Sequence, residues 1–165
     1  MLHKAVVSGL ILDAESNTPI LLLKSENNDQ VLPIWIGILE ATAIATSLKG
    51  VHFDRPMTHD LFLNLLKQAG LMVTRVEVCD IEESTFYAKI HFASPESSFS
   101  LDARPSDAVA IALRTDAPIY IDEIVFLKSR KKEEPVYMED DSEEGKKWAE
   151  YLKNLTSDEF GKYKI

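Results

Sequence analysis

The spacing of apolar residues changes along the chain and divides it into short strands and helices. Residues 3–13 and 18–25 alternate or run apolar on either side of the turn-forming residues 13–17, which predicts a β-hairpin. Residues 31–36 continue as a third strand. Apolar residues then recur at helical spacing over 38–48, so the first part of the chain predicts a β-β-β-α unit.

The rest of the chain shows a second series of the same kind. A helix is predicted over 58–69, with Gly70 at its end. The elements expected after it are strands at 72–80, 85–93 and 97–103, a helix at 106–115, and a short strand at 118–126. Helices and strands in this order predict an α+β fold with a mixed or antiparallel sheet.

An internal repeat relates the two series. When the chain is shifted by 67 residues without gaps, eight positions are identical and Glu40 falls on Asp107. The identical pairs are Val6/Val73, Asp13/Asp80, Glu15/Glu82, Thr18/Thr85, Ala41/Ala108, Ala43/Ala110, Ile44/Ile111 and Ala45/Ala112. The same shift superposes three predicted strands and a helix. We therefore predict two duplicated β-β-β-α units joined by the 58–69 helix, although alanine-rich helices can also match by coincidence.

The end of the chain differs in composition from the two units. Residues 128–146 are dense in charge and contain Pro135 and Gly145, which predicts an exposed linker. Residues 146–155 have the spacing of a short amphipathic helix. The predicted organisation is one domain over residues 1–127, followed by a charged linker and a short C-terminal helix over 128–165.

Composition and charge limit the classes of function. No apolar run approaches the roughly 18 residues that cross a bilayer, so we expect no membrane-spanning helix. The one cysteine, Cys79, cannot form an internal disulfide, which fits a cytoplasmic protein. Residues 1–127 hold 9 Lys and Arg against 17 Asp and Glu, giving −8 of the net charge of −9. Because nucleic-acid binding by bulk charge usually needs a basic face, any phosphate site must be local.

Two Arg-Pro sequences offer such a local site. Arg55-Pro56 precedes Thr58 and Asp60 at the start of the second helix, and Arg104-Pro105 precedes Ser106 and Asp107 at the start of the third. Hydroxyl and acidic side chains suit helix starts, so these residues could simply cap the helices. Alternatively, helix amides beside a guanidinium could bind phosphate. The spacing alone leaves both interpretations open.

A second group of candidates surrounds the third helix. Asp102 lies on the polar face of the predicted strand before it, and Arg104, Asp107 and Arg114 lie close to one helical face. An Arg–Asp ion-pair network that fixes this corner is an alternative to a catalytic role.

Carboxylates and a histidine near these corners are suited to phosphodiester hydrolysis. Oxygen ligands suit Mg²⁺ or Mn²⁺, for which Glu40, Asp102 and Asp107 are candidates. His59 is a candidate proton donor or acceptor. The candidate catalytic residues are His59, Asp60, Asp102 and Asp107, and the candidate substrate-binding residues are Arg55, Arg104 and Arg114.

Several ungapped motifs resemble those of the bifunctional nuclease family, a bacterial and plant domain. The resemblance extends over about residues 3–127 in order. It rests on residues 32–37 (Leu-Pro-Ile-Trp-Ile-Gly), Glu40-Ala41, residues 55–61 (Arg-Pro-Met-Thr-His-Asp-Leu), residues 85–88 (Thr-Phe-Tyr-Ala), residues 102–108 (Asp-Ala-Arg-Pro-Ser-Asp-Ala) and residues 117–119 (Ala-Pro-Ile).

The resemblance implies an α+β fold, a homodimer, and nuclease activity on both DNA and RNA. It assigns no established role to each motif residue. The competing hypothesis is a non-catalytic binding or regulatory module whose Arg and Asp motifs are structural, and the good helix-capping chemistry and the negative charge favour it.

Overall fold

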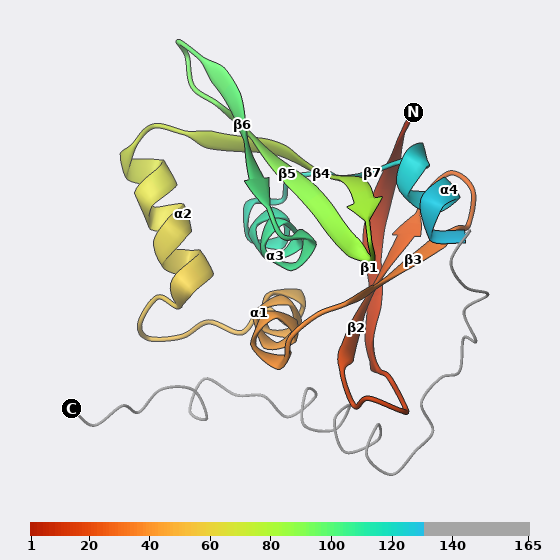
Figure 1. Ribbon diagram of the computed structural model, residues 1–165. Helices are drawn as coiled ribbons and strands as arrows, with labels where there is room; N and C mark the ends of the chain where they lie inside the picture. The colour runs from red at the N-terminus through yellow and green to blue at the C-terminus, as the bar shows by residue number, and fades with distance from the viewer. Residues whose placement is uncertain (131–165) are drawn as a thin grey trace.

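The computed structural model describes residues 1–130, and Figure 1 shows how their elements are arranged. The first unit contains strands β1 (Leu2–Leu12), β2 (Pro19–Ser25) and β3 (Val31–Trp35) and helix α1 (Ile38–Leu48). Helix α2 (Thr58–Gln68) leads to the second unit, which contains β4 (Met72–Glu82), β5 (Thr85–Ala93), β6 (Ser98–Ala103) and α3 (Pro105–Thr115). Strand β7 (Ile119–Asp122) and helix α4 (Glu123–Arg130) follow. The predicted α+β fold is confirmed.

The strands of both units lie in one mixed sheet. Its order is β3-β2-β1-β7-β4-β5-β6. Strands are antiparallel within each unit, whereas β7 runs antiparallel to β1 and parallel to β4. In the register of β7, Ile119 is paired with Ala5 on one side and with Val76 on the other. The short strand β7 therefore joins the two units into a continuous sheet.

The predicted duplication is confirmed by the order and position of the elements. Helix α1 shifted by 67 residues falls on residues 105–115, the bounds of α3, and the three strands before each helix correspond in order. The two helices pack against each other. Glu40 and Asp107 are each the third residue of their helix. By the same shift, Gly37 corresponds to Arg104, so equivalent helix starts carry very different residues.

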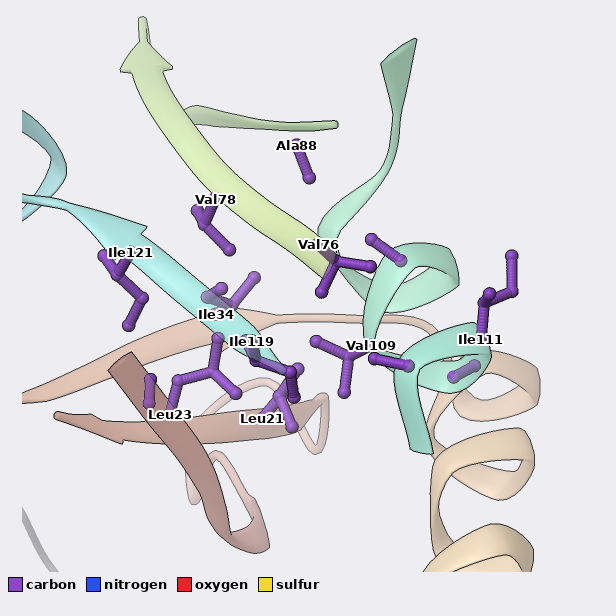
Figure 2. Close-up of a cluster of buried hydrophobic side chains, with 14 of the residues drawn as sticks. Leu21, Leu23, Ile34, Val76, Val78, Ala88, Val109, Ile111, Ile119 and Ile121 are labelled. Carbon is purple, nitrogen blue, oxygen red and sulfur yellow. The ribbon is translucent and has the colours of Figure 1, made fainter. Parts of the chain in front are cut away.

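The core lies between the sheet and the paired helices. Alternate residues of the central strands point to one face, where they are almost completely buried. These include Leu21, Leu23, Val76, Val78 and Ile121, which Figure 2 shows in one cluster with Val109 of α3. Burying one such side chain contributes about 1.5–3 kcal/mol. The core therefore holds α1 and α3 firmly against the sheet and fixes the positions of their first residues.

The segment after α3 differs from the prediction. The strand expected at 118–126 ends at Asp122, because the Asp122 carboxylate accepts a hydrogen bond from the Ile124 N–H (3.0 Å) and starts α4. Val125 and Phe126 are then buried in the core as helical residues. The prediction of a linker from residue 128 is wrong for 128–130, which continue α4. The amphipathic helix predicted at 146–155 lies outside the described residues.

Candidate functional site

Three helix starts provide the side chains of the candidate site. The residues that precede α1, α2 and α3 are Gly37, Met57 and Arg104, and all three have extended backbone. None of them caps its helix with a side-chain hydrogen bond. His59, Asp107 and Glu40, in the first turns of these helices, instead take part in contacts between the helices.

Of the capping alternative, the structure supports the acid Asp60 at α2 but neither of the two hydroxyls. Thr58 and Ser106 lie inside the helices, as their first and second residues. At α3, Pro105 takes the first helical position and disfavours helical backbone at Arg104, so the cap position falls on the arginine. At α2, the Asp60 carboxylate accepts a hydrogen bond from the Met57 N–H (3.1 Å) and does the capping.

Arg104 bridges the two equivalent carboxylates. Its Nε lies 2.8 Å from Oδ2 of Asp107, and its NH1 lies 2.8 Å from Oε1 of Glu40, across 64 residues of sequence. The Arg104 side chain is 64% exposed, whereas that of Glu40 is only 20% exposed. One guanidinium therefore joins α1 to α3 and still faces solvent.

Asp107 also contacts His59 at the start of α2. The His59 Nε2 lies 3.0 Å from Oδ1 of Asp107, and the imidazole is 17% exposed. Burial alone would raise the pKa of Asp107, but the hydrogen bonds from Arg104 and His59 outweigh it and hold that pKa below its ordinary value. Asp107 is thus a stable carboxylate that orients both neighbours.

Gly37 provides the space in which the Glu40 carboxylate lies. A side chain carbon at residue 37 would overlap Oε2 of Glu40, because the carboxylate folds back over the start of its own helix. Gly37 is not among the site residues predicted from the sequence. The 67-residue shift, which places it on Arg104, was the signal that could have identified it.

Asp60 and Arg114 form a separate pair beside this network. Arg114 Nε donates to Oδ1 of Asp60 (2.8 Å), and its NH1 donates to the Ala110 carbonyl (2.9 Å). The Arg114 side chain is only 10% exposed. This pair fastens the end of α3 to the start of α2 and leaves Arg114 little surface for a substrate.

Two predicted site residues lie apart from the network. Asp102 and Arg55 are exposed, and the side chain of neither makes a hydrogen bond or ion pair with another described residue. In the sheet, Asp102 is paired with Lys89 of β5. The structure thus brings together Glu40, His59, Arg104 and Asp107 and leaves Asp102 and Arg55 at the surface.

The predicted metal ligands do not assemble. Within residues 1–130, no three His, Cys, Asp or Glu side chains gather closely enough to hold a metal ion. Glu40 and Asp107 each place one oxygen on Arg104. The side-chain arrangement therefore fits an oriented imidazole beside a guanidinium, not a three-ligand metal centre.

Among the helices of residues 1–130, none has the length and apolar character that a membrane span requires.

Comparison with known proteins gives one family. The family model described as a bifunctional nuclease domain matches residues 21–134. A protein of Mycobacterium tuberculosis (strain CDC 1551 / Oshkosh) named Uncharacterized protein MT1877 is 38% identical over 159 residues, with 93% of this chain and 95% of that protein aligned.

Two plant proteins are more distant. Bifunctional nuclease 1 of Oryza sativa subsp. japonica is 25% identical over 66% of this chain and 34% of its own length. Bifunctional nuclease 2 of Arabidopsis thaliana is 22% identical over 72% of this chain and 37% of its own length. The matched region contains every residue of the candidate site.

Proposed function

Because this chain belongs to the bifunctional nuclease domain family, we propose that it is a nuclease that hydrolyses phosphodiester bonds of DNA and RNA. The observation that supports this best is the connected network of His59, Asp107, Arg104 and Glu40 at three helix starts. It combines a proton acceptor, a carboxylate that orients it, and an exposed cation.

Arg104 is the proposed phosphate-binding group. A guanidinium has five N–H donors, and the bonds to Asp107 and Glu40 use two of them. The other three are free to donate to the non-bridging oxygens of a phosphodiester. The negative charge on these oxygens rises as the attacking oxygen forms its bond to phosphorus. Glu40 and Asp107 hold the guanidinium plane in place, so it need not reorganise during the reaction.

His59 is the proposed general base. With Nε2–H donated to Asp107, the lone pair of Nδ1 can accept a proton from water. Asp107 fixes this tautomer and stabilises the imidazolium that forms, as the carboxylate does in other histidine–carboxylate pairs. Water then forms the new P–O bond, and the bond to the leaving sugar oxygen breaks on the opposite side of phosphorus. That oxygen takes a proton from solvent, and the imidazolium returns its proton to solvent.

Activity on both nucleic acids determines the nucleophile. DNA has no 2′-hydroxyl, so a mechanism shared by DNA and RNA requires water as the attacking group. A mechanism limited to RNA could instead use the 2′-hydroxyl and release a cyclic phosphate. The proposed site therefore predicts linear phosphate products from RNA as well as from DNA.

Assistance of the hydrolysis by Mg²⁺ or Mn²⁺ is a separate proposal, which the nuclease assay described below tests. A magnesium ion often binds one or two carboxylates and completes its shell with water and substrate phosphate. Glu40 and Asp107 are the carboxylates nearest to the proposed phosphate position, but Arg104 already engages both. The steps given above therefore use side chains alone.

The test is a nuclease assay of the full-length protein on DNA and RNA. We expect His59→Ala and Asp107→Asn to lower the rate by roughly 100-fold or more, because general-base catalysis contributes about 10²–10⁴-fold. His52→Ala, an exposed histidine seven residues earlier, is the matched control and should retain the wild-type rate. Each variant is assayed with Mg²⁺, with Mn²⁺ and with a chelator. A wild-type rate in folded His59→Ala would overturn the proposal.

The second candidate function is a non-catalytic binding or regulatory module. The same network favours it, because Glu40, Arg104, Asp107 and His59 also fasten α1, α2 and α3 together. In that case His59→Ala and Asp107→Asn lower the melting temperature, and pure wild-type protein cleaves neither DNA nor RNA with either metal ion.

A further inference from the structure

The second unit carries a group of polar side chains on the face of the sheet that points away from α1 and α3. Along β5, buried core residues alternate with Tyr87, Lys89 and His91, which therefore point to the other face. The register with β4 places Arg75 opposite His91 and Glu77 opposite Lys89, so both lie on that face too. We call these five residues the open-face group. Tyr87 and Lys89 are exposed, so the group is accessible from solvent.

Glu77 holds the cationic side chains of this group in place. Its side chain is only 11% exposed. Its Oε1 accepts a hydrogen bond from Arg75 Nε (2.7 Å), and its Oε2 lies 3.0 Å from His91 Nε2. The bond to Glu77 uses one of the five N–H donors of Arg75, whose side chain is 41% exposed. The guanidinium is therefore held in a fixed orientation and keeps donors for an anion in solvent.

Tyr87 connects the open-face group to the candidate site. The pairing of β5 with β6 ends at Ala88 and Ala103, and the same register continued by one residue places Tyr87 opposite Arg104. Directly opposed residues lie about 5 Å apart, and Lys89 follows Tyr87 about 7 Å further along β5. A line of positions therefore runs from Arg104 through Tyr87 to Lys89 and Arg75.

We propose that this line binds the substrate strand beyond the phosphate at Arg104, as a single-stranded nucleic acid with one base stacked on Tyr87 and backbone phosphates on Lys89 and Arg75. The proposal rests on the proposed function, because it assigns a path to the substrate of the same site. Cations beside an aromatic ring are the combination with which proteins hold single strands. In a duplex the bases are stacked on one another and paired, so none is available to Tyr87.

The acidic neighbours of this line leave Lys89 available to a phosphate. Asp80, which lies opposite Tyr87, is held by Lys128 (2.6 Å). Asp102 of β6 lies opposite Lys89, yet within residues 1–130 neither side chain makes an ion pair or hydrogen bond. The Asp102 carboxylate repels a phosphate bound to Lys89. Charge complementarity therefore predicts opposite effects on binding when these two facing residues are neutralised.

Binding of a fluorescent single-stranded DNA oligonucleotide to the full-length protein tests this path. A His59→Ala background and a chelator protect the probe from cleavage. Tyr87→Ala should weaken binding roughly tenfold through lost stacking, whereas Tyr87→Phe keeps the ring and the affinity. Lys89→Gln should lower the slope of log affinity against log salt concentration by about 0.7, the value for one phosphate contact to a single strand. The matched control is Lys49→Gln, an exposed lysine at the end of α1, which should change neither quantity.

Two further measurements separate the path from general stickiness and from catalysis. Asp102→Asn should strengthen binding about twofold to threefold, the size expected for one like charge removed at about 6 Å in water. A duplex of the same sequence should bind more weakly and respond little to Tyr87→Ala. Unchanged single-strand binding in Tyr87→Ala and Lys89→Gln would overturn the path, even if wild type cleaves nucleic acid. Binding that depends on both residues, in a protein that cleaves neither DNA nor RNA, would support the path and refute only the nuclease proposal.

Discussion

Replacing Arg104 by lysine separates the catalytic role of this residue from its structural role. Lysine keeps the charge but has a single nitrogen, so it can retain only one of the two bonds to Glu40 and Asp107. The side chain is 64% exposed, and an exposed ion pair contributes only about 0.2–1 kcal/mol. The expected loss of stability is therefore about 0.5–1 kcal/mol, roughly 2–5 °C in melting temperature for a domain of this size.

The effect on activity should be much larger than the effect on stability. The variant loses the planar fork that the proposed mechanism places against the phosphate, and Asp107 loses a bond that orients it toward His59. Loss of one preoriented donor in a transition state typically costs about 10²–10³-fold. Because lysine keeps the positive charge, we expect kcat/KM to fall by roughly 10–100-fold.

Arg114→Lys is the matched control, since it makes the same chemical change at a buried site. Arg114 is 10% exposed and donates to both Asp60 and the Ala110 carbonyl. Removing one partner from buried hydrogen bonds costs about 1–3 kcal/mol. This variant should therefore melt lower than Arg104→Lys, yet keep its specific activity per folded molecule.

The assay is thermal melting and nuclease rate measured on the same preparations of both variants. If Arg104→Lys keeps the full rate per folded molecule, Arg104 does not bind the reacting phosphate and the proposed role is wrong. If Arg114→Lys loses the rate while its melting temperature is unchanged, the substrate-binding role predicted from the sequence belongs to Arg114 instead.

Further measurements test other parts of the structure. Gly37→Ala should displace the flexible Glu40 carboxylate without unfolding the protein, so Gly37→Ala and Glu40→Gln should each lower kcat/KM by roughly threefold to tenfold, and the double variant should be no worse. An additive loss would contradict this coupling. The pKa of Asp107 is lower in the folded than in the unfolded chain. Its ionised form therefore stabilises the fold fully above about pH 3.9, and this stabilisation is lost as the pH falls through the pKa of the folded protein. The difference in melting temperature between wild type and Asp107→Asn should thus be largest at neutral pH and should disappear in acid. A difference that does not depend on pH would contradict this prediction. Burial raises the pKa of Cys79, so a thiol reagent at mildly alkaline pH should react more slowly with the native protein than with the unfolded chain.

The fold was largely predictable because apolar residues recur at regular strand or helix spacing in both units. The bounds predicted for α1, 38–48, agree with the structure, and the 67-residue shift predicts those of α3. The segment 118–126 was not predictable in the same way. Its apolar residues at 119, 121, 124, 125 and 126 fit a strand pattern at first, and the change to a helix depends on one hydrogen bond from Ile124 to Asp122.

The site was predictable as a set of residue types but not as a geometry. Arg104 and Asp107 are three residues apart at a helix start, so their ion pair follows from local spacing. The contacts to Glu40 and His59 span 64 and 48 residues, and they depend on how three helices pack. Asp102 faces the sheet surface away from them because one more residue along a strand reverses the side-chain direction.

The pairing of Gly37 with Arg104 shows what a fused duplicate can do that two identical subunits cannot. In a symmetric pair of units, an arginine at both positions would place two cations between the same two carboxylates, and they would repel each other. Within one chain, the two copies are free to diverge at a single residue. Glycine in the first copy leaves room for Glu40, while the second copy supplies the only guanidinium that both acids share. The duplicated fold thereby holds one cation in a defined orientation, at a position where two identical units would place two.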